Sequence, residues 1–185
     1  MDKIRNLIST LLGLLVLAMP VTVSVAMILS GCQGRDEGDL PFETIERADS
    51  AGTGEYYEGE KPKLVIIAEA AEINTLGNTV SPDAQAQLRN LDFDHHFVVA
   101  VFQGWRPTLP TPQSGVEVQG ISRKEGRITI YAQFYKPVEG YEQKDVVTSP
   151  YHLVTMRKGE DMQGEFEFVL NVDGADVVRQ THLID

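Results

Sequence analysis

The alternation of apolar and polar residues divides this chain into three parts. An uncharged apolar run covers residues 7–31, a polar stretch rich in acids and glycine follows, and short apolar runs recur from Lys63 onward. The recurring runs have the length of β-strands and are separated by glycine, proline and other turn residues. The pattern therefore predicts an N-terminal apolar helix, an unstructured connection and a folded domain.

Seven of the short runs predict strands. They cover residues 63–69, 96–104, 116–122, 127–136, 150–158, 165–171 and 175–184. The run 96–104 is apolar at nearly every position, which is typical of a central strand covered on both faces. The run 127–136 alternates strictly, so that Ile128 and Ile130 share one face while Tyr131 and Tyr135 share the other.

Turn signals connect these strands. The segments 124–126 and 172–174 each end in glycine and predict hairpins, and Gly120 breaks the alternation as a β-bulge would. Three prolines follow the strand 96–104 and predict a stiff loop that takes no part in a strand ladder: Pro107, Pro110 and Pro112.

The fold class that follows is α+β. A short helix opens at Ser81 as its N-cap, with Pro82 at the first helical position. We expect a mainly antiparallel β-sheet of about six to seven strands with this one short helix. The expected domains are a signal peptide (1–31), a disordered acidic tether (32–62) and the folded domain (63–185).

The first 31 residues have the features of an export signal. Lys3 and Arg5 precede the uncharged run, which is about 25 residues long and could cross a bilayer core of about 30 Å as a helix. Basic residues before an apolar helix keep the N-terminus in the cytoplasm. The residues after position 31 are therefore expected outside the cytoplasm. A cleaved signal peptide and a retained membrane helix both fit this pattern.

Leu29-Ser30-Gly31-Cys32 resembles the lipobox of bacterial lipoprotein precursors. In that family the cysteine thiol receives a diacylglycerol and becomes the first residue after cleavage, and two acyl chains anchor a protein stably. The resemblance implies that Cys32 carries a covalent lipid and that the protein is held at a membrane of the bacterial cell envelope. Gln33 in place of an aspartate favours the outer membrane or cell surface.

The net charge of −11 is concentrated near the anchor. Residues 33–60 hold nine acids against Arg35 and Arg47, whereas residues 61–185 carry a net −5. An acidic, glycine-rich stretch with few apolar residues predicts a disordered spacer, with an acidic recognition tail as the alternative. Without a basic patch, nucleic acid is disfavoured as a partner.

No catalytic motif is visible in the sequence, and the expectation is a protein that is not an enzyme. Asp92, Asp94, His95 and His96 form the one cluster with metal-ligand chemistry. A metal-dependent hydrolase is therefore the alternative function, and a polar connection between the helix and the central strand is the plain interpretation. Adjacent His95 and His96 would point to opposite faces of an extended chain.

Two aromatic features are candidate partner-binding residues. Trp105 and Arg106 begin the proline-stiffened loop, and such residue types are frequent at interface hot spots. The alternative is that Trp105 folds back onto the sheet edge with Arg106 stacked on it. Tyr131 and Tyr135 form either a flat aromatic binding surface or a half-covered sheet face.

Residues 97–158 resemble the PrcB C-terminal domain family. The resemblance rests on an apolar strand ending in Gly104, a loop, two paired strands closed by Pro137, and Thr148-x-Pro150-Tyr151 before the next strand. Where that family often has Gly-Gly-Tyr, this chain has Ser114-Gly115-Val116. Because the family takes its name from a lipoprotein subunit of a surface protease complex, the resemblance implies a non-catalytic accessory domain.

The expected function is thus that of a lipid-anchored, exported binding protein. Its partner would be another protein, an exported protease or an envelope component. A purely structural envelope lipoprotein is the further alternative.

Overall fold

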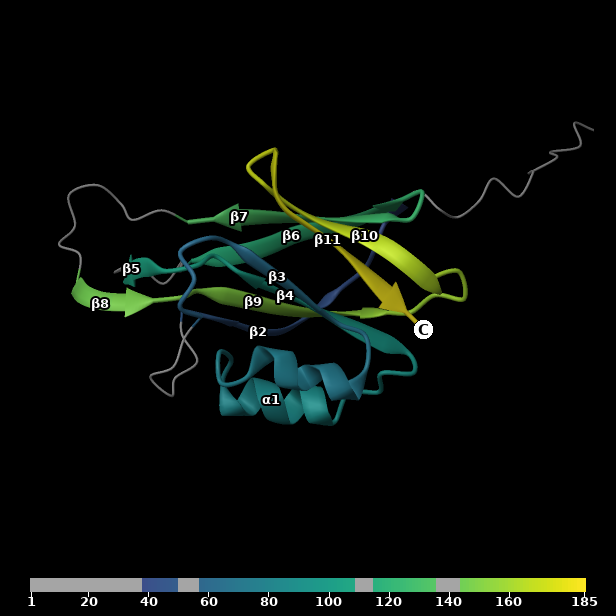
Figure 1. Cartoon of the computed structure of the whole chain (residues 1–185), viewed down its shortest axis with the longest axis horizontal. Coiled ribbons are helices and arrows are strands. Elements are labelled where there is room, and N and C mark those ends of the chain that lie inside the picture. The colour runs from purple at the N-terminus through teal and green to yellow at the C-terminus, as the bar shows by residue number, and fades with distance from the viewer. Residues whose placement is uncertain (1–37, 50–56, 109–114, 136–143) are drawn as a thin grey trace, which may run out of the picture. The chain divides into compact units, whose positions relative to one another are not determined.

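Two stacked β-sheets and one layer of helices make up the part of the chain that the structure describes (Figure 1). The structure is a computed structural model, and it describes residues 38–49, 57–108, 115–135 and 144–185. No helix within these residues is long and apolar enough to cross a membrane.

The first sheet has five strands in the order β1-β6-β7-β10-β11. Their bounds are Gly38–Asp39 (β1), Val116–Lys124 (β6), Arg127–Phe134 (β7), Gly164–Val172 (β10) and Ala175–Ile184 (β11). The two predicted hairpins join β6 to β7 and β10 to β11, and each turn contains a glycine with positive φ, Gly126 or Gly174. The register of β6 and β7 shifts between Val118 and Gly120, which confirms the predicted bulge.

The second sheet has four strands in the order β2-β9-β4-β3, all antiparallel. Their bounds are Glu43–Ala48 (β2), Tyr151–Arg157 (β9), His96–Phe102 (β4) and Lys63–Ile67 (β3). The central position of β4 confirms the prediction made from its continuous apolar run. A separate two-stranded ribbon pairs β5 (Arg106–Thr108) with β8 (Lys144–Thr148).

The two faces of the four-stranded sheet contact different layers. Val99 of β4 and Val154 of β9 belong to a core shared with Ile128, Ile130 and other apolar residues of the five-stranded sheet. Val98 and Ala100 of β4 point the other way and pack under the helices. The four-stranded sheet, which we call the middle sheet, is therefore buried on both faces. Burial of its apolar side chains is the main stabilising contribution to the fold.

The helical layer consists of a 3₁₀ helix, η1 (Ala70–Leu76), and the helix α1 (Pro82–Arg89). Ser81 caps α1 as predicted, since its Oγ accepts the Ala84 backbone N–H at 3.0 Å. Ala84 and Leu88 are fully buried against the middle sheet.

The α+β assignment holds at the level of a mostly β domain with two short helices, but three details differ from expectation. The structure contains two sheets and the ribbon rather than one sheet of about seven strands. Strands β1, β2, β5 and β8 were not predicted. Strands β7 and β10 pair in parallel, because β8 and β9 intervene in the sequence and carry the chain through other sheets.

The expectation of a disordered tether over residues 32–62 is wrong for β1 and β2. Strand β2 forms the edge of the middle sheet and pairs with β9. Ile45 and Ala48 pack against the helix-side core, and Leu40 and Phe42 pack against the core between the sheets. The segment is rich in acids and glycine, so its composition did not indicate that these few apolar residues are packed against the two cores.

Glu46, counted in the sequence as a solvated acid, fastens β2 to two other elements. Its Oε2 accepts a hydrogen bond from the Tyr151 hydroxyl, and its Oε1 accepts one from Ser81 Oγ at 2.7 Å. The Tyr151 oxygen in turn accepts the Ser81 backbone N–H at 3.0 Å. Burial, together with the Glu46 carboxylate, raises the pKa of Tyr151 far above its usual range.

Replacing Glu46 with alanine should destabilise the domain by about 1–3 kcal/mol, because the buried Tyr151 hydroxyl and the helix cap lose their shared acceptor. Urea denaturation measures the free energy of unfolding. Glu43→Ala is the matched control, since Glu43 lies in the same strand and is exposed, and it should change stability by less than about 0.5 kcal/mol. Equal effects of the two substitutions would contradict the assigned role of Glu46.

Candidate functional site

The ribbon of β5 and β8, with the Gly104-Trp105 turn that leads into it, forms a candidate interaction site at one end of the sandwich (Figure 1). We call this segment the arm. Trp105 is 43% exposed, and it is one of four large hydrophobic residues that are exposed in the part of the chain that the structure describes. Part of the Trp105 surface is therefore accessible to a partner, while the larger part is covered by the protein.

The backbone at the base of the arm is fixed by residues 59–61. The Trp105 N–H donates to the Gly59 carbonyl at 2.9 Å. Gly104 has a φ of +85°, and a Cβ at this position would lie 2.7 Å from the Glu60 carbonyl oxygen. Glycine is therefore required here both by conformation and by the close approach of the neighbouring backbone.

Arg106 holds backbone carbonyls rather than the Trp105 ring. Its Nη1 donates to the carbonyl oxygen of Trp105 at 2.6 Å and to that of Glu60 at 3.4 Å. Trp105 and Arg106 therefore have different positions. The Trp105 side chain is partly exposed, whereas the Arg106 guanidinium binds the backbone of the turn.

Two buried polar atoms at the base of the arm have no signal in the sequence pattern. Gln103 Oε1 and Ser149 Oγ belong to residues 2% and 1% exposed, and neither has a hydrogen-bond partner among the described residues. Gln103 precedes the turn into β5, and Ser149 follows β8 directly. Unsatisfied buried polar groups are uncommon in folded proteins.

The prediction that the prolines exclude ladder pairing is wrong for Pro107, which pairs with Val147 in the ribbon. A two-stranded ribbon has an open edge on each strand, and proline is tolerated where its missing N–H would face outward. Pro110, Pro112 and Pro137 lie outside the described residues.

The comparisons with known proteins match one family to this chain. The family described as PrcB C-terminal matches residues 97–157. Residues 97–157 form a PrcB C-terminal-like module. No curated protein and no solved structure matches the chain.

The PrcB-like module contains β4 to β9, and therefore both strands of the arm. Two of its motif residues, Gly104 and Tyr151, have structural roles, since Gly104 admits the 59–61 backbone and Tyr151 binds Glu46 and Ser81. The module is thus completed by β2 and by the helical layer, both of which precede it in the sequence.

The two candidate tyrosines of the PrcB-like module lie in different surroundings. The Tyr135 hydroxyl donates to Glu117, and the Arg47 guanidinium carbon lies 5.4 Å from the centre of its ring. The hydrogen bond to Glu117 raises the pKa of Tyr135. Tyr131 is 44% exposed, so it remains the more accessible of the two.

The structure uses the Asp92 cluster to build a turn. His95 Nδ1 donates to Asp92 Oδ2 at 2.8 Å, the Asp94 N–H donates to Asp92 Oδ1, and His96 Nδ1 donates to the Asp92 carbonyl. The hydrogen bond from His95 lowers the pKa of Asp92. Within the described residues no three histidine, cysteine, aspartate or glutamate side chains are placed to share a metal ion.

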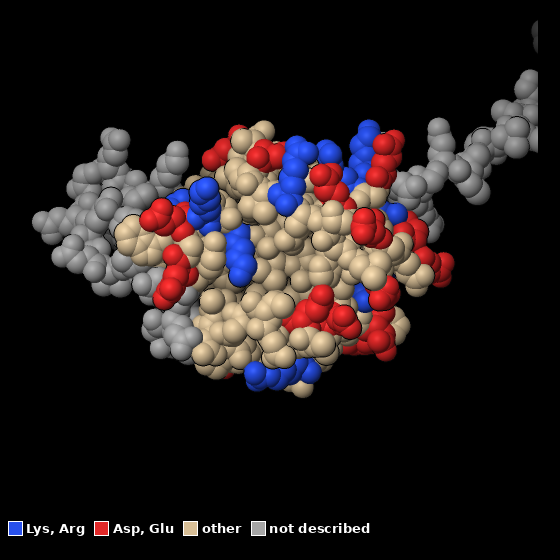
Figure 2. Space-filling model, viewed as in Figure 1, with Lys and Arg blue, Asp and Glu red and all other residues tan. Residues whose placement is uncertain are grey.

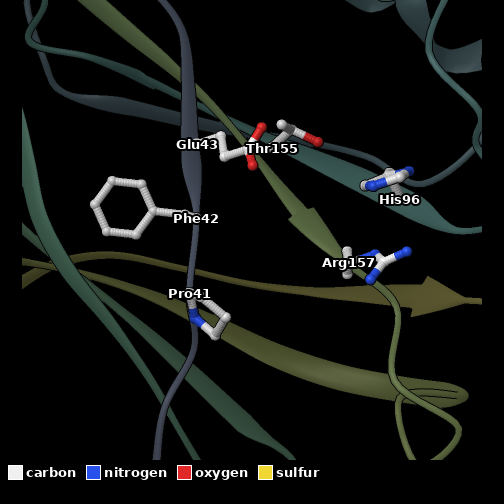
Figure 3. Close-up of a pocket in the computed structure, with 6 residues that line it drawn as sticks. All are labelled: Pro41, Phe42, Glu43, His96, Thr155 and Arg157. Atoms are coloured by element: carbon white, nitrogen blue, oxygen red, sulfur yellow. The ribbon is translucent and has the colours of Figure 1, made fainter.

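Two surface depressions among the described residues carry charges of both signs. One, of about 320 Å³, is lined by His96 and Arg157 on one side and by Glu43 on another, while the Phe42 ring points away (Figure 3). A second, of about 560 Å³, includes Glu69, Glu72 and Lys158. Acidic side chains gather where the helical layer approaches the C-terminus (Figure 2).

His152, the residue after Tyr151, is the most strongly perturbed imidazole of the described part. It is 3% exposed, its Nδ1 accepts the Val118 N–H at 2.8 Å, and its Nε2 lies 2.9 Å from Thr44 Oγ1. Because Nδ1 accepts, the neutral ring carries its proton on Nε2 and donates to Thr44. His152 therefore joins β2, β6 and β9 and cannot act as a base toward the Thr44 hydroxyl.

Burial, and then the positive charge of Arg47, lowers the pKa of His152 to about 4, whereas Glu117 opposes this shift. The unfolded chain takes up a proton here below about pH 6.5, but the folded chain does so only near pH 4. The contribution of neutral His152 to the free energy of unfolding is therefore complete above pH 6.5. It is lost as the pH falls toward 4.

Between pH 7 and pH 5, His152 alone should lower the free energy of unfolding by about 2 kcal/mol. Urea denaturation of the wild type and of His152→Gln at both pH values measures the free energy of unfolding. The variant should lack this decrease of about 2 kcal/mol between pH 7 and pH 5. His95→Gln is the control, since its side chain is 71% exposed. A His152→Gln slope equal to the wild-type slope would disprove the assignment.

Proposed function

We propose that this protein is a lipid-anchored, exported accessory protein whose PrcB-like module binds another protein through the arm. A component of an exported protease complex is the partner class that the family resemblance favours. The observation that carries the proposal is the exposed Trp105 on a rigidly held turn inside the matched module.

The geometry of the arm supports this role. The Trp105 backbone is held by the Gly59 carbonyl and by the Arg106 guanidinium, so little backbone entropy is lost when a partner contacts the turn. Large aromatic residues contribute much of the binding energy in protein interfaces.

The lipid anchor is proposed from the sequence alone, because Cys32 lies outside the described residues. If Cys32 is acylated, the spacer to the domain is much shorter than a tether of residues 32–62. Six peptide links separate Cys32 from Gly38 at the start of β1, and they reach at most about 22 Å. The domain would therefore operate next to the membrane surface.

Intact-mass measurement of the protein purified from membranes should show Cys32 as the first residue, with the added mass of a diacylglycerol. Cys32→Ala should retain residues 1–31 and carry no lipid. A wild-type protein with residues 1–31 still attached and a free thiol at Cys32 would contradict the anchor.

Trp105→Ala should lower the recovery of the principal co-purifying protein at least about tenfold when the full-length chain is purified from detergent-solubilised envelopes. Leu183→Ala is the control, because Leu183 is 54% exposed on β11 and lies outside the arm. The loss should be repeated with the purified partner in a direct binding measurement. Equal recovery with wild type and Trp105→Ala would contradict binding through the arm.

A further inference from the structure

A neutral polar surface surrounds Tyr131 on the outer face of the five-stranded sheet. Its members extend from β6, β7 and β10, and we call them the neutral face: Gln119, Ser122, Thr129, Tyr131, Gln133 and Asn171. The core lies on the opposite side of this sheet, and the helices lie beyond the second sheet (Figure 1). Among the described elements, none packs over the neutral face.

The Tyr131 ring is held in place against the bulge of β6. Gly120 lies opposite Tyr131 in the register, and a Cβ on Gly120 would be 3.9 Å from Tyr131 Cδ2. The ring thus rests over the glycine, and the Ser122 hydroxyl donates to its oxygen at 3.4 Å. Tyr131 is also 44% exposed, so one face of its ring remains accessible to a ligand. We call this ring the aromatic platform.

Amide groups lie beside the ring. Gln119 Nε2 donates to Gln133 Oε1 at 2.6 Å, which fixes both side chains. In this arrangement Gln119 Oε1 is an acceptor and the Gln133 amide nitrogen is a donor that this bond leaves unused. The platform is therefore flanked by oriented groups that can both donate and accept.

Two ion pairs lie at the border of the neutral face, and in each pair the charges balance. Arg127 Nε lies 2.6 Å from Glu167 Oε2, and Arg179 Nη2 lies 2.7 Å from Asp176 Oδ2. Asp176 also accepts a hydrogen bond from Asn171 Nδ2 at 2.7 Å. In a chain with a net charge of −11, a surface without excess charge selects for an uncharged ligand.

We infer that the neutral face binds an uncharged glycan chain. Sugar rings present apolar C–H faces that pack on an aromatic ring, and their hydroxyl and acetamido groups match side chains that both donate and accept. A nucleic acid would require cationic contacts to its phosphates. The buried centre of a protein interface is usually more apolar than one tyrosine among amides and hydroxyls.

The test is a titration of the full-length protein with chitohexaose and with cellohexaose, followed by ¹⁵N NMR in a detergent without a sugar headgroup. At least one hexasaccharide should bind saturably and shift the amide signals of β6 and β7. Tyr131→Ala should weaken this binding about fivefold or more, whereas Tyr131→Phe should stay within about twofold of wild type.

Two further variants keep the outcome interpretable. The double variant Gln119→Ala/Gln133→Ala leaves the ring in place and should also weaken binding, which covers the case in which Tyr131→Ala fails to fold. Leu183→Ala, at a residue 54% exposed near the other end of β11, should bind as the wild type does. Trp105→Ala should likewise bind the sugar normally, which separates this inference from the proposed role of the arm.

The inference is overturned if the wild type binds neither hexasaccharide, or if binding survives both Tyr131→Ala and the double glutamine variant. It is also overturned if Tyr131→Ala abolishes binding of a protein partner while no sugar binds, since the neutral face would then be a protein interface.

Discussion

The Glu46 carboxylate is the point at which three separate elements of this protein are joined. It accepts hydrogen bonds from Tyr151 of β9 and from Ser81 at the start of α1, while its own strand pairs with β9. His152 adds a second link from β9 to Thr44 of β2 and to Val118 of β6. A carboxylate that is taken from water must be compensated by such donors. The PrcB-like module is consequently stabilised along the edge of β9 by a strand from the acidic N-terminal segment.

The sequence allowed prediction of the elements whose signal is local. Alternation at Ile128 and Ile130, the cap at Ser81 and the glycines at the hairpin turns each identify an element by nearby residues alone. The short strands β1, β2, β5 and β8 have no such local signal, because their stability comes from partners distant in the sequence. Likewise, the exposure of Trp105 and the contact of Tyr131 with Gly120 depend on packing that a sequence pattern does not contain.

The described residues place accessible aromatic side chains on two different surfaces. Trp105 stands on the arm, where the backbone of residues 59–61 and the Arg106 guanidinium fix the turn. Tyr131 lies on the outer face of the five-stranded sheet among amide and hydroxyl side chains. Asp92, which the sequence offered as a metal-ligand candidate, builds a turn, and the buried His152 bridges strands. If both proposed surfaces bind, the protein would contact an uncharged glycan and a protein partner together.

The proposed position of the domain next to a membrane depends on how soon order begins after Cys32. Hydrogen exchange of the full-length protein, followed amide by amide, tests this most directly. If β2 is an integral strand, its amides that are hydrogen-bonded to β9 should be protected to within about tenfold of the protected amides of β9 itself. Exchange of residues 43–48 at the rate of an unstructured chain, with β9 still protected, would show that the acidic segment is a free tether and would contradict the account.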